Sequence, residues 1–296
     1  MLGTGESTIY AILFCIFMFI MGAGLGSFLC CQARRLRRRE LHKPSLGSRS
    51  VCLHCRHQLR WYDNIPLFSW VYSRGRCRYC HFFFGWAEFL SEIAGAITFL
   101  SLALLFIRPS FTPLIAEPFM SLSLFGINPV TNFPAYHPLT WVIFVLTIIL
   151  ILALLFLAIY DGLYGELPVA LLTFAAICAI IVVILRIWSY FLISPTTHSL
   201  ADLILPPLVG ALILGGLYLT LYLVSHGRWV GDGDWYLAAI IGLVLGSPFA
   251  ALVALLLSNL SATLIMAPAT MKRKTRRIHF GPFLVLGFLL TSLLLA

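Results

Sequence analysis

Long apolar runs, each of about 20 residues, recur along this chain and constrain its fold more than any other feature. A helix needs about 20 apolar residues to cross ~30 Å of hydrocarbon at 1.5 Å per residue. Because 60% of the residues are hydrophobic and only 10% are charged, a soluble fold is excluded. We therefore expect an all-α integral membrane protein with about eight transmembrane helices.

The predicted spans follow these apolar runs. They are Ile9 to Cys31, Trp86 to Ile107, Leu139 to Tyr160, Pro168 to Ile187, Leu203 to Ser225, Trp235 to Gly246, Pro248 to Ala267 and Gly281 to Ala296. The first lacks the basic leading end of a signal peptide, and we interpret it as a retained anchor with a small-residue packing face at Gly22 and Gly26. The sixth is too short to cross unaided, so it tilts, thins the bilayer or merges with the seventh.

Positive charge is concentrated in one loop, which fixes the orientation. Twelve of the 20 Lys and Arg residues lie between Gln32 and Gly85, against two acidic residues, so the positive-inside rule predicts a cytoplasmic loop. An anchored loop beside acidic lipid explains this charge better than nucleic-acid binding, so we expect the lipid bilayer as a partner and no nucleic acid. Eight spans also place a second basic cluster in the cytoplasm, namely Lys272, Arg273, Lys274, Arg276 and Arg277.

Four cysteines in the basic loop form two C-x-x-C pairs, Cys52 with Cys55 and Cys77 with Cys80. Each pair presents two thiolates from one tight turn, and two turns complete a tetrahedral zinc site. Disulfides are the alternative, but a cytoplasmic loop is reducing. A closed four-cysteine site has no open coordination position, so we expect structural Zn²⁺ that folds the loop.

Four acidic residues from two distant segments fall at cytoplasmic helix ends in this topology: Asp161, Glu166, Asp232 and Asp234. Two carboxylates brought together there share a proton, so that one acts as a base toward water and the other as an acid. Gly231 and Gly233 let the backbone approach closely around Asp232. The alternative is that the acids only cap helices, and we favour it for Asp232 and Glu166.

The chain resembles the bacterial prepilin peptidases, which are type IV leader peptidases and membrane aspartic proteases with a G-x-G-D motif. The resemblance covers nearly the whole chain. It rests on GSFL from Gly26, the cysteine quartet enclosing WYDNIPLFSW and RGRCRYC, Glu88, Asp161 with Leu167-Pro168, GDGD from Gly231, and FGPFL from Phe280.

This resemblance implies that Asp161 and Asp234 are catalytic, with Gly231, Gly233 and Glu88 in supporting roles. The substrate would be a type IV prepilin or pseudopilin precursor, cleaved after the glycine that ends its basic leader. The active site would face the cytoplasm from a prokaryotic inner membrane. Many members also methylate the new amino terminus with S-adenosylmethionine, an activity associated with the zinc loop, and the retained cysteines favour both activities.

The expected organisation is a first transmembrane helix over 1–31, a basic cytoplasmic loop with the four-cysteine zinc site over 32–85, and a multi-span catalytic core over 86–296. Two alternatives stay open. One is a peptidase without methyl transfer, in which zinc is purely architectural. The other is a non-enzymatic transporter or assembly component that uses the acids as a proton relay. The sequence sets no oligomeric state.

Overall fold

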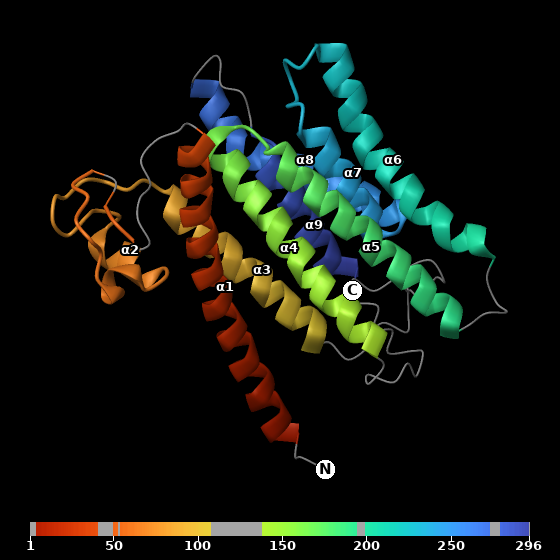
Figure 1. The fold of residues 1–296 in the computed structure, drawn as a ribbon, viewed down its shortest axis with the longest axis horizontal. Coiled ribbons are helices and arrows are strands. Elements are labelled where there is room, and N and C mark those ends of the chain that lie inside the picture. Colours follow the sequence, from red (N-terminus) through yellow and green to blue (C-terminus); the bar gives the residue numbers. More distant parts are fainter. Residues whose placement is uncertain are drawn as a thin grey trace. The chain divides into compact units, whose positions relative to one another are not determined.

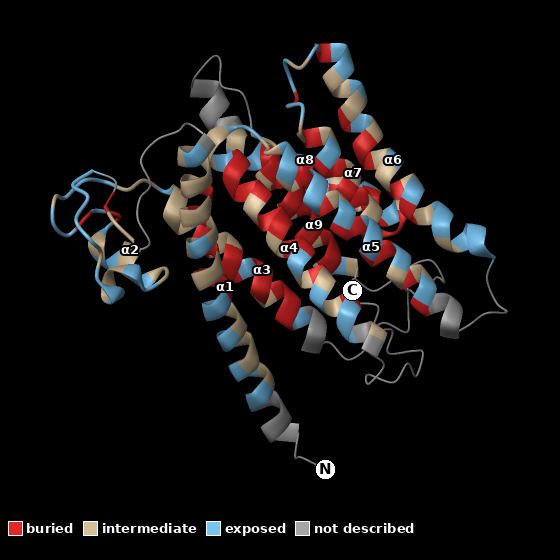
Figure 2. Ribbon diagram, in the orientation of Figure 1, coloured by how far each residue is buried: buried red, intermediate tan, exposed pale blue. Residues whose placement is uncertain are grey.

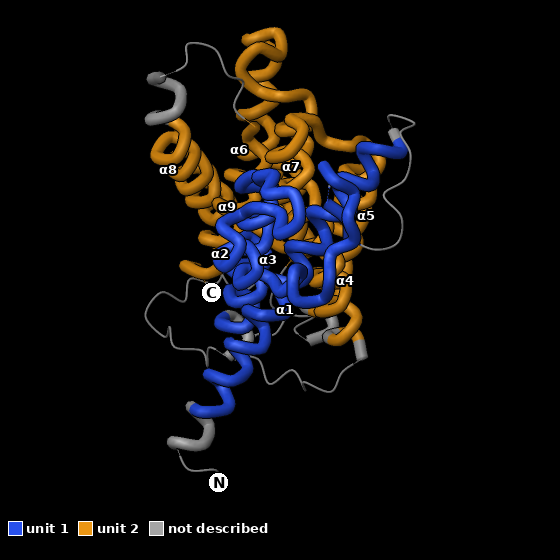
Figure 3. Tube along the Cα trace, turned by 90° about the vertical axis from the view of Figure 1, so that its left-hand side faces the viewer, with its two compact units in different colours: residues 1–107 blue, residues 108–296 orange. Residues whose placement is uncertain are grey.

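The computed structural model describes residues 4–40, 50–52, 54–107, 138–193, 199–272 and 279–295. Within these ranges the chain is helical, with two isolated β-bridges and no strand, so the expected all-α fold is confirmed. Two compact units, residues 1–107 and 108–296, make up the chain (Figure 3). The three-part division expected from the sequence stays a prediction. Of the second basic cluster, Lys272 ends a helix and the other four residues lie outside the described ranges.

The first unit is built on two long helices, α1 (Thr4–Glu40) and α3 (Ala87–Ile107), shown in Figure 1. Between them in sequence come a 3-10 turn, η1 (Trp61–Asn64), and a short helix, α2 (Phe68–Ser73). The predicted first span ended at Cys31, but helix α1 continues to Glu40 through five arginines. Arginine is a good helix former, so the end of an apolar run does not mark the end of a helix.

Three glycines allow α1 and α3 to pack backbone against backbone. A Cβ built on Gly22 would meet the Gly95 carbonyl oxygen, and one on Gly26 would meet the Ser91 carbonyl oxygen. A Cβ built on Gly95 would likewise meet the Gly22 carbonyl oxygen. The predicted packing face at Gly22 and Gly26 is therefore confirmed, because any side chain there would force the helices apart.

The second unit contains six helices among its described residues. They are α4 (Pro138–Tyr164), α5 (Val169–Ile193), α6 (Leu200–Ser225), α7 (Asp234–Leu245), α8 (Pro248–Lys272) and α9 (Gly281–Leu295). Gly246, with φ 69°, ends α7 in the left-handed conformation, and α8 begins two residues later, so the sixth and seventh predicted spans are separate helices. At 12 residues α7 is about 18 Å long, too short to cross a bilayer unaided.

Burial in the second unit separates its central helices from its lipid-facing ones (Figure 2). Helices α7 and α9 are mostly buried, whereas α6 and α8 leave large apolar side chains such as Leu212 and Leu264 exposed. Exposed apolar side chains on long apolar helices are expected where lipid is the solvent. Six described helices, α1, α3, α4, α5, α6 and α8, are long and apolar enough to span a membrane.

Candidate active site and metal centre

Asp161 lies in the last turn of α4 and is almost completely buried, with 4% of its surface exposed. Its Oδ2 accepts a 2.9 Å hydrogen bond from the backbone N–H of Gly281, the first residue of α9. An unpaired N–H at a helix N-terminus is a favourable partner for a carboxylate. The helix continues beyond Asp161 to Tyr164 and ends at Gly165, whose φ of 69° suits glycine.

Asp234 is the first residue of α7 and is also 4% exposed. Its Oδ2 accepts a 3.0 Å hydrogen bond from the backbone N–H of Gly231, three residues earlier. A Cβ on Gly231 would lie only 3.1 Å from this oxygen, so the glycine allows the turn to close on the carboxylate. In both aspartates, the hydrogen bonds from described residues reach Oδ2 and leave Oδ1 available to another group.

Gly233 joins the two segments that carry the aspartates. A Cβ built at Gly233 would lie 2.7 Å from Cβ of Leu167, in the turn between α4 and α5. This contact explains why the position after Asp232 needs glycine. It holds the two aspartates within electrostatic range of each other, although 73 positions separate them in the sequence.

Both aspartates line one cavity of about 710 Å³ in the second unit. Glu166 and Asp232 also line it and are exposed. Against these four acids the lining contains one arginine, Arg228, and one histidine, His279. The cavity is therefore negatively charged and suits a positively charged ligand.

Two residues at this site were not predicted as functional. Gly281 would bring a Cβ to within 2.8 Å of the Asp161 carboxylate, so the close approach requires glycine. His279 packs its ring against Gly165 and interacts electrostatically with Asp234. The FGPFL motif was the only signal near either residue, and nothing in it indicated which chain segment it would contact.

The four cysteines of the first unit come from two turns with the same backbone geometry. In the first turn, the N–H of Cys52 donates to the His57 carbonyl and the N–H of Arg56 donates to the Cys52 carbonyl, each at 2.9 Å. The second repeats both bonds, from Cys77 to Phe82 and from His81 to Cys77, at the same 2.9 Å. Arg56 and His81, each following the second cysteine of its pair, both adopt a left-handed conformation, with φ of 58° and 54°.

These two turns bring the four Sγ atoms of Cys52, Cys55, Cys77 and Cys80 to within 4.8 Å of one another. The Cys52 and Cys80 sulfurs are 3.8 Å apart, which is too far for a disulfide bond. It is the separation expected in a tetrahedron with metal–sulfur bonds of about 2.3 Å, so the site fits zinc. Two nearby histidines pack against aromatic rings and are not part of the cysteine cluster: His54 stacks on Phe82, and His57 contacts Tyr79.

Glu88 lies in the first turn of α3, where its Oε1 forms a 2.5 Å ion pair with Nη2 of Arg34 in α1. This residue belongs to the first unit, whereas both aspartates belong to the second. The ion pair gives Glu88 a role in joining α1 to α3. Its supporting role in catalysis stays a prediction.

Known proteins resemble the chain over both units. The profile of the Bacterial Peptidase A24 N-terminal domain matches residues 20–106. A prepilin leader peptidase/N-methyltransferase from Myxococcus xanthus is 44% identical over 68 residues, which are 23% of this chain and 19% of that protein. A protein with the same name from Pectobacterium carotovorum is 30% identical over 241 residues, which are 80% of this chain and 71% of that protein. The chain belongs to the prepilin leader peptidase/N-methyltransferase family.

Further members of this family give a consistent picture. The Aeromonas hydrophila prepilin leader peptidase/N-methyltransferase is 27% identical over 243 residues, covering 81% of this chain and 69% of that protein. No solved structure matches the chain. The match to the Pectobacterium protein is long enough to extend beyond the first unit, so the family assignment does not depend on the cysteine-rich loop alone.

Proposed function

We propose that this chain is a membrane aspartic endopeptidase that removes the basic leader of a type IV prepilin or pseudopilin precursor, cutting after the leader's final glycine. The observation that carries the proposal is the pair of buried carboxylates, Asp161 and Asp234, in one cavity. Each is held by one backbone N–H through Oδ2, so each presents the other oxygen for chemistry.

The two aspartates share one proton, because like charges close together in a buried site do not both ionise readily. The ionised carboxylate takes a proton from a water molecule, whose oxygen attacks the carbonyl carbon of the peptide bond. The protonated carboxyl group donates its proton to the carbonyl oxygen. When the C–N bond breaks, the carboxyl group that took the proton from water gives it to the departing amine, while the other carboxylate takes a proton back from a hydroxyl group of the intermediate. The pair thereby returns to its starting state.

The charge of the cavity supports a basic substrate. Four acids, Asp161, Glu166, Asp232 and Asp234, line it with a single arginine, so a positively charged leader is attracted to it. The basic loop, through the positive-inside rule, supports a position of the acids at the cytoplasmic face of a prokaryotic inner membrane. There the leader would reach the pair while the adjoining apolar segment of the precursor stays in the bilayer.

We propose N-methylation of the newly exposed amino terminus as a second activity, with S-adenosylmethionine as the methyl donor. The retained four-cysteine centre and the names of the relatives support it. The metal would be Zn²⁺, held by Cys52, Cys55, Cys77 and Cys80. It would stabilise the loop by linking its two turns, and with four sulfur ligands it would have no open position for a reaction.

The test uses the purified full-length protein in detergent, a pilin-like precursor and S-adenosylmethionine, with the product read by intact mass. Wild type should yield a shortened and methylated product. Asp161→Asn and Asp234→Asn should each lower the cleavage rate by about three orders of magnitude or more, because neither variant can share a proton between two carboxylates.

Asp202→Asn is the matched control, because this exposed acid lies in the first turn of α6 and outside the cavity. The variant should cleave at the wild-type rate. Full cleavage by both dyad variants would refute the peptidase. A shortened but unmethylated product from wild type would identify a peptidase without methyl transfer. Absence of cleavage by wild type on several pilin-like precursors would favour a non-enzymatic role.

A further inference from the structure

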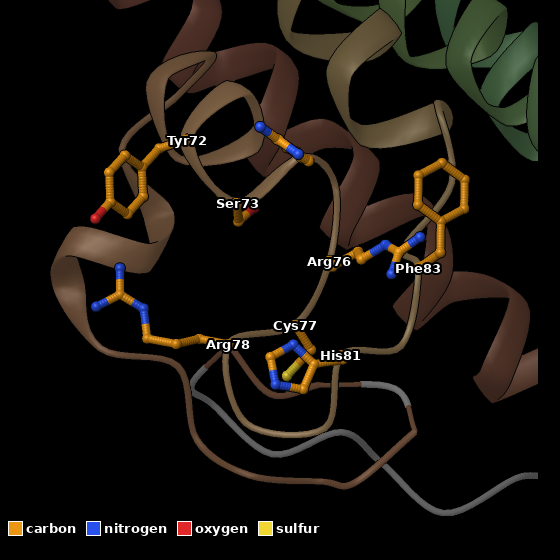
Figure 4. Close-up of a pocket in the computed structure, with 8 residues that line it drawn as sticks. Tyr72, Ser73, Arg76, Cys77, Arg78, His81 and Phe83 are labelled. Carbon is orange, nitrogen blue, oxygen red and sulfur yellow. The ribbon is translucent and has the colours of Figure 1, made fainter.

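Three arginines line a second cavity, located in the cysteine-rich loop of the first unit (Figure 4). It has a volume of about 480 Å³. The lining residues are Tyr72, Ser73, Arg74, Arg76, Cys77, Arg78, His81 and Phe83. No acidic residue is among them. The cavity is therefore chemically opposite to the one that holds the aspartates.

The local sequence RGRCR accounts for the arrangement of these arginines. Burial alternates along this segment: Gly75 and Cys77 are buried, and the three arginines, Arg74, Arg76 and Arg78, are exposed. Gly75 is wedged between Trp70 and Phe83, and a Cβ there would lie 2.9 Å from either ring. Cys77 belongs to the four-cysteine cluster, and its backbone N–H donates to the Phe82 carbonyl at 2.9 Å. The buried residues thus fix the backbone, and the arginines alternate outward from it.

The arginines differ in how far their charge is already neutralised. Nε of Arg78 lies 3.3 Å from Oδ1 of Asp63, and its guanidinium lies 4.8 Å from the centre of the Tyr62 ring. The side chains of Arg74 and Arg76 have no hydrogen-bond or ion-pair partner within the described part of the loop. Two positive charges at the cavity therefore have no counter-charge among the described residues, and an anion would supply one.

Large apolar side chains are exposed next to this charge. Trp61, Phe68, Val71 and Tyr72 are each between 60% and 79% exposed, and all belong to η1 or α2. The loop is joined at both ends to helices long and apolar enough to span a membrane, α1 and α3. Exposed aromatic rings beside arginines are typical of surfaces that contact the headgroup layer of a bilayer.

We propose that this cavity binds the phosphate headgroup of an anionic phospholipid, with Arg74 and Arg76 as the main ligands. Arg78 orders the rim through Asp63, and the exposed side chains of η1 and α2 contact the surrounding headgroup layer. Attachment of the loop to two membrane helices favours lipid over a soluble anion, because it keeps the cavity close to the bilayer surface at all times. The site is independent of the proposed peptidase chemistry, since all its residues lie in the first unit.

The test measures hydrogen exchange by mass spectrometry in the full-length protein, placed in nanodiscs of phosphatidylcholine with or without phosphatidylglycerol. Phosphatidylglycerol should slow exchange in peptides that cover Tyr72 to Phe83. Arg76→Gln should weaken this protection about fivefold, the effect expected of one basic residue at an anionic surface, and Arg76→Lys should keep it. A third sample, phosphatidylcholine nanodiscs with added inorganic phosphate, should show none.

Arg56→Gln is the matched control, because it removes one exposed arginine beside a metal-ligand cysteine but outside the cavity. It should retain protection by phosphatidylglycerol. Equal loss of protection in Arg56→Gln and Arg76→Gln would overturn the proposed site. It would leave only a general attraction between the basic loop and anionic lipid. Protection by inorganic phosphate alone would overturn the lipid as occupant, and no protection in any sample would overturn the proposal. A variant whose exchange in phosphatidylcholine differs from wild type is misfolded and is replaced by Arg74→Gln.

Discussion

Gly281 lets the first N–H of α9 approach the Asp161 carboxylate, and the structure leaves no room there for a side chain. In Gly281→Ala the new Cβ would lie 2.8 Å from Oδ2 and 3.1 Å from Cβ of Asp161. The carboxylate must then move away from the backbone donor. We expect cleavage to slow by at least about tenfold, since losing one hydrogen bond to a charged group costs about 1.5–3 kcal/mol.

Gly216→Ala provides the comparison for this prediction. The nearest atom to a Cβ at Gly216 is 4.0 Å away, so the substitution meets no obstacle. Cleavage rates and melting temperatures of the two variants, measured in the same detergent, separate an effect on the carboxylate from an effect on folding. Wild-type cleavage by Gly281→Ala would show that the hydrogen bond to Asp161 is dispensable.

The sequence indicated the acidic residues of this site more readily than the groups that hold them. Asp161 and Asp234 were proposed because acids at the ends of apolar runs are costly and because GDGD resembles a family motif. Gly281 and His279 were missed because their partners, Asp161 and Gly165, are more than 100 positions away in the sequence. Only tertiary packing brings such pairs together, so no local pattern contains them.

Among the elements, α7 is short and begins at Asp234, a proposed catalytic residue. A shift of α7 along its axis would therefore move the Asp234 carboxylate. Arg186 in α5 is 2% exposed and donates a 3.0 Å hydrogen bond from Nη1 to the carbonyl of Val244, in the last turn of α7. A cation near helix C-terminal carbonyls is favourable. One end of α7 therefore carries Asp234, and the other is held by α5.

We expect Arg186→Ala to lower the free energy of unfolding by about 2–5 kcal/mol, because it removes this bond and leaves a cavity. A thermal melt of the purified protein should show a clear drop in melting temperature. Ile184→Ala on the same helix is the control. Because the isoleucine is 57% exposed, this substitution should change the melting temperature little. Equal melting temperatures for Arg186→Ala and wild type would mean that α7 does not depend on this contact.

Apolar runs predicted which elements exist, but not where each of them ends. All eight predicted spans correspond to helices among the described residues, including the short α7 and α9. The predicted end of the first span was nine residues early, because charge stops an apolar run without stopping helical hydrogen bonding. The small helix α2 was not predicted, since six residues packed around Trp70 carry no helical periodicity.

At the scale of the whole molecule, the four-cysteine cluster and the aspartates fall into different compact units, residues 1–107 and 108–296. Cys77→Ser removes one of the four proposed zinc ligands and should abolish stoichiometric zinc binding, measured by elemental analysis. Methyl transfer should be lost in this variant if it depends on the folded loop. Cleavage should stay within about tenfold of the wild-type rate, because the contacts of Asp161 and Asp234 lie in the other unit.

Cys15→Ser is the matched control, because Cys15 lies in α1 of the same unit and outside the metal centre. It should retain zinc, cleavage and methyl transfer. If Cys77→Ser lost cleavage as completely as Asp234→Asn, the two units would be functionally inseparable. Retained zinc in Cys77→Ser would show that three cysteines suffice to hold the metal.

The bond from Gly281 to Asp161 also bears on how the protein is made. Both aspartates are translated before α9, so a nascent chain interrupted ahead of residue 279 would contain the pair without the N–H that holds Asp161. The proposed protease would then acquire its finished centre only after α9 had entered the membrane and packed against α4. Late completion of this kind would keep a partly inserted chain from cutting neighbouring proteins at the site of synthesis.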